Sequence, residues 1–350
     1  MDLLRAFVLL FLASAGLLAL LVTLIAGRKT LRDRRETASL RRRDRLRHAL
    51  DSGHPRSMRR AFGAIGDRSA EVDLATVLQE PGRAGRDSLA LEREVRRSGL
   101  LRRLERNLRS PHAPTRGRAT LILGHLRLPG GVERIERMLD DRDPDVRLVA
   151  CTGLAIARVP EAVDALVRAL SRRRLAPERV IERLGQPWAV DTLLAALVRL
   201  DAEGERRSAP RIGIARALGV AGDARAEPAL VQLLGNGSVE ERISAARALG
   251  SVGGEAARPA LELALGDPEW ALRAQAAKAL GKIASAHSVA AVEAVLDDPA
   301  WWVRANAAAT LRVLGPPGRA ALERALEHED AYARDRAREA LAMDRVAPAA

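Results

Sequence analysis

The strongest constraint on the fold is a repeat of about 31 residues, in which an arginine is followed seven positions later by a leucine. The pairs are Arg116/Leu123, Arg147/Leu154, Arg211/Leu218, Arg242/Leu249, Arg273/Leu280, Arg304/Leu311 and Arg334/Leu341. Successive arginines are 31, 64, 31, 31, 31 and 30 residues apart, and the 64-residue interval indicates a degenerate unit near residues 178–185 with a short insertion. A period of this length predicts stacked small units in place of one globular core.

Each unit reads as two helices joined by a turn. The position three after the arginine is usually alanine, so it shares one apolar helix face with the leucine at position seven. A second apolar segment precedes the arginine, as in residues 228–234 and 259–265, and Asp-Pro turns at 143–144, 267–268 and 298–299 lie between the two. Aromatic residues make up only 2% of the chain, which argues against a β-sheet. We expect the second helices to close on left-handed glycines, namely Gly124, Gly219, Gly250 and Gly281.

The N-terminus carries a long uncharged segment. Residues 6–26 are 21 residues without a charge, and as a helix they would reach about 31 Å, which is enough to cross a bilayer. A signal peptide is the alternative, but its small-residue pattern, Ala13-Ser14-Ala15, lies in the middle of the run. The sequence therefore predicts an uncleaved transmembrane helix over residues 6–27.

Charge near this segment predicts its orientation. Residues 28–60 hold 13 Lys plus Arg and 4 Asp plus Glu, and such basic flanks stay on the cytoplasmic side. We expect the N-terminus outside and the rest in the cytoplasm. The basic residues that would meet anionic lipid headgroups are Arg28, Lys29, Arg32, Arg34 and Arg35. The alternative is that they act only as a topology signal.

The rest of the chain has no excess charge. Residues 121–350 contain 32 basic and 32 acidic side chains, so the net charge of +13 lies before residue 121, and nucleic acid is not expected as a partner. Lysine occurs only at Lys29, Lys278 and Lys282, and arginine-rich usage of this kind is typical of a high-GC bacterium. The predicted location is the bacterial inner membrane, as a single-pass protein.

Two of the units carry a specific resemblance. Residues 267–273, Asp-Pro-Glu-Trp-Ala-Leu-Arg, and residues 298–304, Asp-Pro-Ala-Trp-Trp-Val-Arg, resemble HEAT repeats, in particular the HEAT-like subtype of phycobiliprotein lyases. The resemblance implies an all-α solenoid whose second helices line a concave surface. The expected organisation is an extracytoplasmic N-terminus (1–5), a transmembrane helix (6–27), a basic juxtamembrane helix (28–53), degenerate first repeats (54–110), the solenoid (111–343) and a disordered tail (344–350).

The resemblance also implies a structural role for the aspartate of each turn and the arginine six residues later. These should link turns to helix starts along the stack. The residues assigned to this ladder are Asp141, Arg147, Arg242, Asp267, Arg273, Asp298 and Arg304. Asn236, Glu205 and Ser110 stand where other units would have the aspartate.

No pattern for catalysis or metal binding stands out. The six histidines include no HExxH motif, and the single pair His328-Glu329 is too few for the di-iron site of HEAT-repeat deoxyhypusine hydroxylase. Cys151 occupies a column that holds alanine in other units, which indicates a buried small side chain. We therefore predict no catalytic residue, no metal and no cofactor. The alternatives are a HEAT-like enzyme such as a bilin lyase, or a nucleic-acid binder similar to the HEAT-like alkylpurine DNA glycosylases.

The predicted function is a membrane-anchored scaffold that binds a protein partner on the concave surface. The polar residues that helical spacing places on this surface are Arg216, Ser244, Arg247, Gln275, Lys278, Lys282 and Asn306. A solvated face with no partner is the alternative. For Trp188, Trp270, Trp301 and Trp302 we expect packing at the ends of the helix stack, with partner contact as the alternative.

Overall fold

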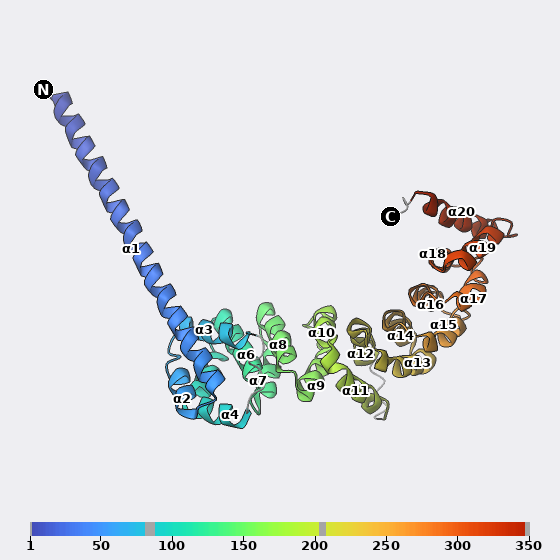
Figure 1. The fold of residues 1–350 in the computed structure, drawn as a ribbon, viewed down its shortest axis with the longest axis horizontal. Coiled ribbons are helices and arrows are strands. Elements are labelled where there is room, and N and C mark those ends of the chain that lie inside the picture. The colour runs from blue at the N-terminus through green and yellow to red at the C-terminus, as the bar shows by residue number, and fades with distance from the viewer. Residues whose placement is uncertain (1, 81–87, 203–207, 347–350) are drawn as a thin grey trace. The chain divides into compact units, whose positions relative to one another are not determined.

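The computed structural model describes residues 2–80, 88–202 and 208–346 of the chain. Within these ranges the side chains of residues 2–20, 22, 27, 88, 89, 208 and 344–346 lie outside the description. All regular structure in the described ranges is helical, as the sequence predicts (Figure 1). The chain divides into two units, Met1–Gly131 and Val132–Ala350, and each is described by itself.

The first unit contains a long N-terminal helix and five shorter ones. Its helices are α1 (Asp2–Ser52), α2 (Pro55–Gly63), α3 (Arg68–Leu78), α4 (Ser88–Arg97), α5 (Leu100–Asn107) and α6 (Ala113–Leu126). The segments expected as a transmembrane helix and a juxtamembrane helix form one continuous helix, α1, since no glycine–proline break or capping sequence separates them. Helices α2 to α5 occupy the region expected to hold degenerate repeats.

The predicted membrane span falls largely outside the residues with described side chains. Among the residues that the structure does describe, none of the helices combines the length and the apolar character that crossing a membrane requires. Every described side chain between residues 21 and 38 is exposed, and burial begins at Ser39.

The last third of α1 packs like the second helix of a hairpin. It contacts α2 and α3, and α3 in turn contacts α6, so α1, α3 and α6 form one row. Asp73 of α3 is almost fully buried and accepts hydrogen bonds from Arg42 Nε at 2.8 Å and Arg43 Nε at 2.9 Å. Arg47 pairs with Glu80 at 2.7 Å. Part of the basic segment after residue 40 is therefore engaged inside the protein.

The second unit is a double row of helices. They are α7 (Gly131–Arg137), α8 (Pro144–Ala157), α9 (Pro160–Ala169), α10 (Pro177–Leu184), α11 (Val190–Ala202), α12 (Ser208–Ala221), α13 (Glu227–Asn236), α14 (Val239–Val252), α15 (Arg258–Ala264), α16 (Trp270–Ile283), α17 (Val289–Glu293), α18 (Trp301–Val313), α19 (Gly315–Ala325) and α20 (Ala331–Val346). The even-numbered helices from α8 to α20 contact one another in order and form the row of second helices, visible from α12 to α18 in Figure 1. Helix α10 is the degenerate unit expected near residues 178–185.

The second helices end three residues later than the sequence suggests. Gly124, Gly219, Gly250 and Gly281 lie within their helices, and the left-handed backbone stands at the eleventh position after the arginine. That column holds Gly222 and Gly253 but also residues with a side chain, namely Arg127, Arg158 and Ala284. The expectation that the four glycines close the helices is therefore wrong.

Close approach between neighbouring second helices explains three of these glycines. A Cβ atom on Gly250 would lie 2.9 Å from the Cα of Ala279, and one on Gly219 would lie 2.8 Å from the Cα of Ala248. A Cβ on Gly281 would lie 2.5 Å from Thr310 Oγ1. Glycine at 219 and 250 leaves room for two backbones to meet, and Gly281 leaves room for the Thr310 side chain.

The last helix extends past the residue at which the tail was expected to begin. Helix α20 continues to Val346, so residues 344–346 are helical although we expected a disordered tail from residue 344. Alanine, methionine and arginine are good helix formers, and the next helix breaker in the sequence is Pro348. Residues 347–350 lie outside the described part of the chain.

Candidate functional site

Arginines at the start of the second helices join each unit to its own turn and to the next unit. Arg273 Nη1 donates to the backbone carbonyls of Asp267, at 2.8 Å, and Pro268, at 3.1 Å. Its Nε and Nη2 donate to the carboxylate of Asp298, in the following turn, at 2.6 and 2.9 Å. One guanidinium therefore bridges two successive units.

The same arrangement recurs along the row. Arg304 donates to the carbonyls of Asp298 and Pro299, and Arg147 donates to those of Asp141 and Arg142. Arg242 pairs with the carboxylate of Asp267. Asp267 and Asp298 thus each accept hydrogen bonds from two arginines. The backbone carbonyl accepts from the arginine of the same unit, and the carboxylate accepts from the arginine of the preceding unit.

The ladder adapts where the aspartate is missing. Arg211 lies 3.2 Å from Glu241, which also completes the capping box with Ser238 at the start of α14. Arg304, in the last gap between units, stacks on the ring of Tyr332 at 4.7 Å from its centroid. Burial alone would raise the pKa of Asp298, but hydrogen bonds from Arg273 and the Ala300 N–H hold that pKa below its ordinary value.

The predicted basic column lies on three consecutive second helices. Arg216 is on α12, Arg247 on α14 and Lys278 on α16, and these helices contact one another. Arg247 and Lys278 are exposed, and no acidic side chain of the described residues pairs with them. Arg216 is half-buried and lies 3.5 Å from Glu178. Lys282 is exposed and donates to Ser251 Oγ at 3.3 Å.

The other predicted polar residues lie closer to the interior. Ser244, Gln275 and Asn306 occupy the second position after their arginines, and all three are half-buried. Asn306 Nδ2 donates to the backbone carbonyl of Ala274 at 2.8 Å and so ties α18 to α16. The structure therefore brings Arg247 and Lys278 to the exposed face and turns Asn306 toward the preceding unit.

Aromatic side chains at the starts of the last second helices are exposed. The exposed fractions are 47% for Trp270, 47% for Trp301, 58% for Trp302 and 63% for Tyr332, so the packing expected for the tryptophans leaves about half of each of these three side chains open to solvent. Trp301 and Trp302 meet edge to face with centroids 4.6 Å apart. Trp188, by contrast, is half-buried.

Trp302 shares a helix face with other exposed apolar residues. Val313 lies eleven residues after Trp302 on α18, and Met343 lies eleven residues after Tyr332 on α20, which is a spacing of about three turns. Val313 is 50% exposed and Met343 60% exposed. We call these four residues together with Arg247, Lys278 and Lys282 the second-helix face. It is basic on α14 and α16 and apolar on α18 and α20.

Sequence reasoning selected the basic half of this face. It gave partner contact for Trp302 only as the alternative to packing, and it did not select Val313, Tyr332 or Met343. The signal was present, because Trp302 and Tyr332 both stand two residues before the repeat arginine, where neither can point into the core. Such clusters of exposed aromatic and aliphatic side chains are uncommon on protein surfaces that face only water.

The groups that could support other chemistry are embedded in the fold. Cys151 is fully buried, and loss of hydration raises the pKa of its thiol to about 11, which makes the thiolate scarce. His328 accepts a hydrogen bond from the N–H of Asp330 in the last turn. Among the described residues, no three His, Cys, Asp or Glu side chains are grouped so that they could hold a metal ion.

Comparison with known proteins agrees with this architecture. The family model for HEAT repeats matches residues 100–179, 190–269 and 258–342, which together make up more than half of the chain. The chain therefore belongs to the HEAT-repeat proteins. A search of curated proteins finds no match.

A search of solved structures gives matches at low sequence identity. Human deoxyhypusine hydroxylase in complex with glycerol is 23% identical, with 74% of this chain and 98% of that chain covered and a TM-score of 0.31. An engineered protein is 20% identical over 88% of this chain and 95% of its own, with a TM-score of 0.33. The karyopherin Kap121p bound to the extreme C-terminus of the protein phosphatase Cdc14p is 15% identical. The match covers 85% of this chain and 41% of the karyopherin, with a TM-score of 0.45.

Proposed function

We propose that this protein is a membrane-tethered scaffold that binds a protein partner on the second-helix face. The observation that carries the proposal is the exposure of four apolar side chains in one helix row, namely Trp302, Val313, Tyr332 and Met343. The same row exposes Arg247 and Lys278, and neither forms an ion pair with an acidic side chain of the described residues. Exposed aromatic side chains beside basic ones suit a segment with an apolar anchor and acidic neighbours. Tethering raises the effective concentration of the two proteins without new contacts.

The membrane part of the proposal rests on the sequence. The uncharged residues 6–26 are long enough to span a bilayer, and the basic residues 28–35 favour the N-terminus outside and the repeats in the cytoplasm. We propose the inner membrane of a bacterium as the location. Reporter fusions at residue 350 test this orientation, and periplasmic activity of the reporter would refute it.

The partner-binding face is tested by crosslinking and affinity capture in the native host. The double variant Trp302→Ala, Val313→Ala should weaken capture about 30-fold, because loss of an aromatic hot spot costs about 2 kcal/mol or more. Arg247→Glu with Lys278→Glu should weaken it as well. Trp270→Ala is the matched control, since Trp270 is equally apolar and 47% exposed but lies off this face.

The structural integrity of each variant is checked by circular dichroism and by the denaturation midpoint. If both variants of the second-helix face capture the same proteins at the wild-type level, the second-helix face is not the binding site.

A further inference from the structure

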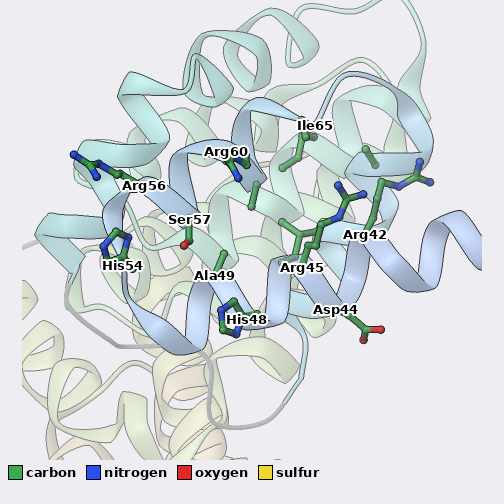
Figure 2. A pocket seen from close by; sticks show the side chains of 14 residues that line it. Arg42, Asp44, Arg45, His48, Ala49, His54, Arg56, Ser57, Arg60 and Ile65 are labelled. Atoms are coloured by element: carbon green, nitrogen blue, oxygen red, sulfur yellow. The ribbon is translucent and has the colours of Figure 1, made fainter.

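A groove in the first unit carries a separate inference. It lies between α1 and α2, has a volume of about 540 Å³, and has Ala70 of α3 and Ile65 in its lining (Figure 2). Its apolar lining consists mainly of small or aliphatic side chains, namely Leu46, Ala49, Ala61, Ala64, Ile65 and Ala70. All of its residues belong to the first unit, so it is distinct from the second-helix face.

The groove lies on the terminal pair of helices in the row. Helix α1 packs on α2 and α3, and α2 packs on α1 and α4, whereas no helix of the described first unit packs comparably on the other side of the pair. In a helical stack, each pair receives the apolar side chains of the next pair in this position. The shape of the groove therefore suits a further helix.

The rim of the groove is strongly basic. Arg42 and Arg45 project from α1, and Arg56 and Arg60 project from α2 on the opposite side, as Figure 2 shows. The acidic side chain on the rim, Asp44, is already paired with Arg47 at 2.7 Å. The groove thus presents positive charge along both of its walls.

Three of these arginines have no acidic partner among the described residues. Arg42 is held by Asp73 and Ser69, but Arg45, Arg56 and Arg60 are exposed and form no ion pair with any described residue. Elsewhere in the first unit, arginines such as Arg43, Arg47 and Arg59 pair with Asp73, Glu80 and Glu94. These three guanidinium groups are therefore gathered beside the apolar groove.

The spacing of the basic residues selects the class of ligand. Arg42 and Arg45 on α1 are three residues apart, which is about 4.5 Å along the helix, and Arg56 and Arg60 are one turn apart on α2, on the opposite wall. Positive charge is therefore spread along the groove and does not converge on one point, as a single phosphate or carboxylate would require.

From these observations we infer that the groove binds an acidic amphipathic helix of a partner protein. The apolar stripe of that helix covers Ala61 and Ala64, beside the nearly buried Leu46 and Ala49. Its flanking Asp or Glu side chains pair with Arg45, Arg56 and Arg60. This is the helix-in-groove mode of recognition, with charge on both walls fixing the register of the bound helix.

A designed peptide tests the inference on the full chain in nanodiscs of zwitterionic phospholipid. The probe is a helix of about 16 residues, long enough to be helical alone, with a leucine–alanine stripe flanked by glutamates. A companion peptide carries glutamine in place of each glutamate. We expect the acidic probe to bind at least about 10-fold more tightly than the companion, and the difference to shrink as salt rises.

Charge exchange gives the sharper comparison. The double variant Arg45→Glu, Arg60→Glu should bind the acidic probe at least about 10-fold more weakly than the unchanged protein does. It should instead bind a version of the peptide in which lysines flank the apolar stripe. Arg102→Glu with Arg106→Glu is the matched control, because it makes the same change in net charge at exposed positions of α5 outside the groove. The milder pair Arg45→Gln, Arg60→Gln guards against misfolding, with the denaturation midpoint as the check.

Several results would overturn the inference. Equal binding of the acidic and glutamine peptides, or an equal loss in the Arg102/Arg106 control, would show that the groove has no specific role. Tight binding of dodecyl phosphate without binding of the peptide would identify an anionic amphiphile as the occupant. Self-association of the full chain that the Arg45/Arg60 variant abolishes would identify a second copy. Retained binding by the Trp302→Ala, Val313→Ala variant separates this site from the second-helix face.

Discussion

At the scale of single residues, the arginine at the start of each second helix is the main connector. Arg273 satisfies two carbonyls of its own turn and neutralises Asp298 of the next, so one side chain orders the backbone of one unit and positions its neighbour. Asp298 is only 8% exposed, and a buried carboxylate without this partner would lack compensation for its lost hydration.

Arg273→Met should therefore lower the free energy of unfolding by about 2 kcal/mol, since it leaves a buried carboxylate unpaired. The measurement is the midpoint of urea unfolding, monitored by circular dichroism. Arg247→Met is the control, and its effect should stay within about 0.5 kcal/mol because Arg247 is exposed and has no ion pair within the described chain. Equal effects of the two variants would contradict the connecting role of Arg273.

At the scale of helices, glycine sets how closely the second helices approach. Gly250 of α14 faces the backbone of Ala279 on α16, and Gly219 of α12 faces that of Ala248 on α14. The eighth position after the arginine is thus a contact between two main chains. The unusual richness in alanine nearby serves the same close packing, with Ala246 and Ala277 fully buried.

Gly250→Ala should destabilise the protein by about 1–3 kcal/mol, because the new methyl group would displace a backbone rather than a flexible side chain. Gly235→Ala provides the control. Gly235 lies in α13, and a Cβ atom added there would meet no neighbouring atom within 4 Å, so alanine should be neutral or stabilise by up to about 1 kcal/mol. Thermal midpoints of the two variants should shift in opposite directions or differ clearly in size.

Attachment of α1 to α3 should depend on pH through Asp73. Burial alone would raise the pKa of Asp73, but hydrogen bonds from Ser39, Arg42 and Arg43 lower it below its ordinary value. A carboxyl whose pKa falls on folding stabilises the folded state above the unfolded pKa of about 3.9, and this contribution is lost as pH falls through the lower folded pKa.

We therefore expect amide hydrogen exchange in residues 39–50 to accelerate relative to α6 when the pH is lowered from 5 to about 3, after correction for intrinsic rates. In Asp73→Asn the protection of this segment should already be reduced at neutral pH and should change little on acidification. An unchanged profile in Asp73→Asn would refute this role for the carboxylate.

The sequence predicted the elements better than the contacts between them. The arginine–leucine period identified the second helices because it reports core burial, and it located α10 despite its degenerate sequence. It misassigned Gly250, since a glycine near a helix end can serve either a left-handed turn or close approach, and only the neighbouring backbone distinguishes them. Arg45 and Arg60 were missed for the same reason: their lack of partners depends on α3 and α4, which the sequence did not align.

At the scale of the whole molecule, charge is divided unevenly along the chain. The excess of +13 lies before residue 121, and most of it follows the uncharged residues 6–26. Some of it, such as Arg42 and Arg43, is neutralised by Asp73, whereas Arg28, Lys29, Arg34 and Arg35 are exposed. The exposed group is the part that remains free to set the proposed topology.

Reversing this group should change the orientation of the chain. Replacement of Arg28, Lys29, Arg32, Arg34 and Arg35 by glutamate should move a reporter at residue 350 to the periplasmic side in a large fraction of molecules, because basic residues beside a span are retained in the cytoplasm. The control reverses five exposed arginines far from the span, namely Arg179, Arg247, Arg312, Arg319 and Arg338. A reporter that stays cytoplasmic in the first variant would contradict the proposal.

Helix α1 runs from Asp2 to Ser52 without interruption, and its packing against the first unit starts only at Ser39. On the proposed topology, residues 28–38 form a rigid stalk that holds the first hairpin about 17 Å from the lipid surface. Deleting one residue from this stalk would rotate the first hairpin about 100° around the stalk axis. Deleting seven would nearly restore its original direction but bring it closer to the lipid surface.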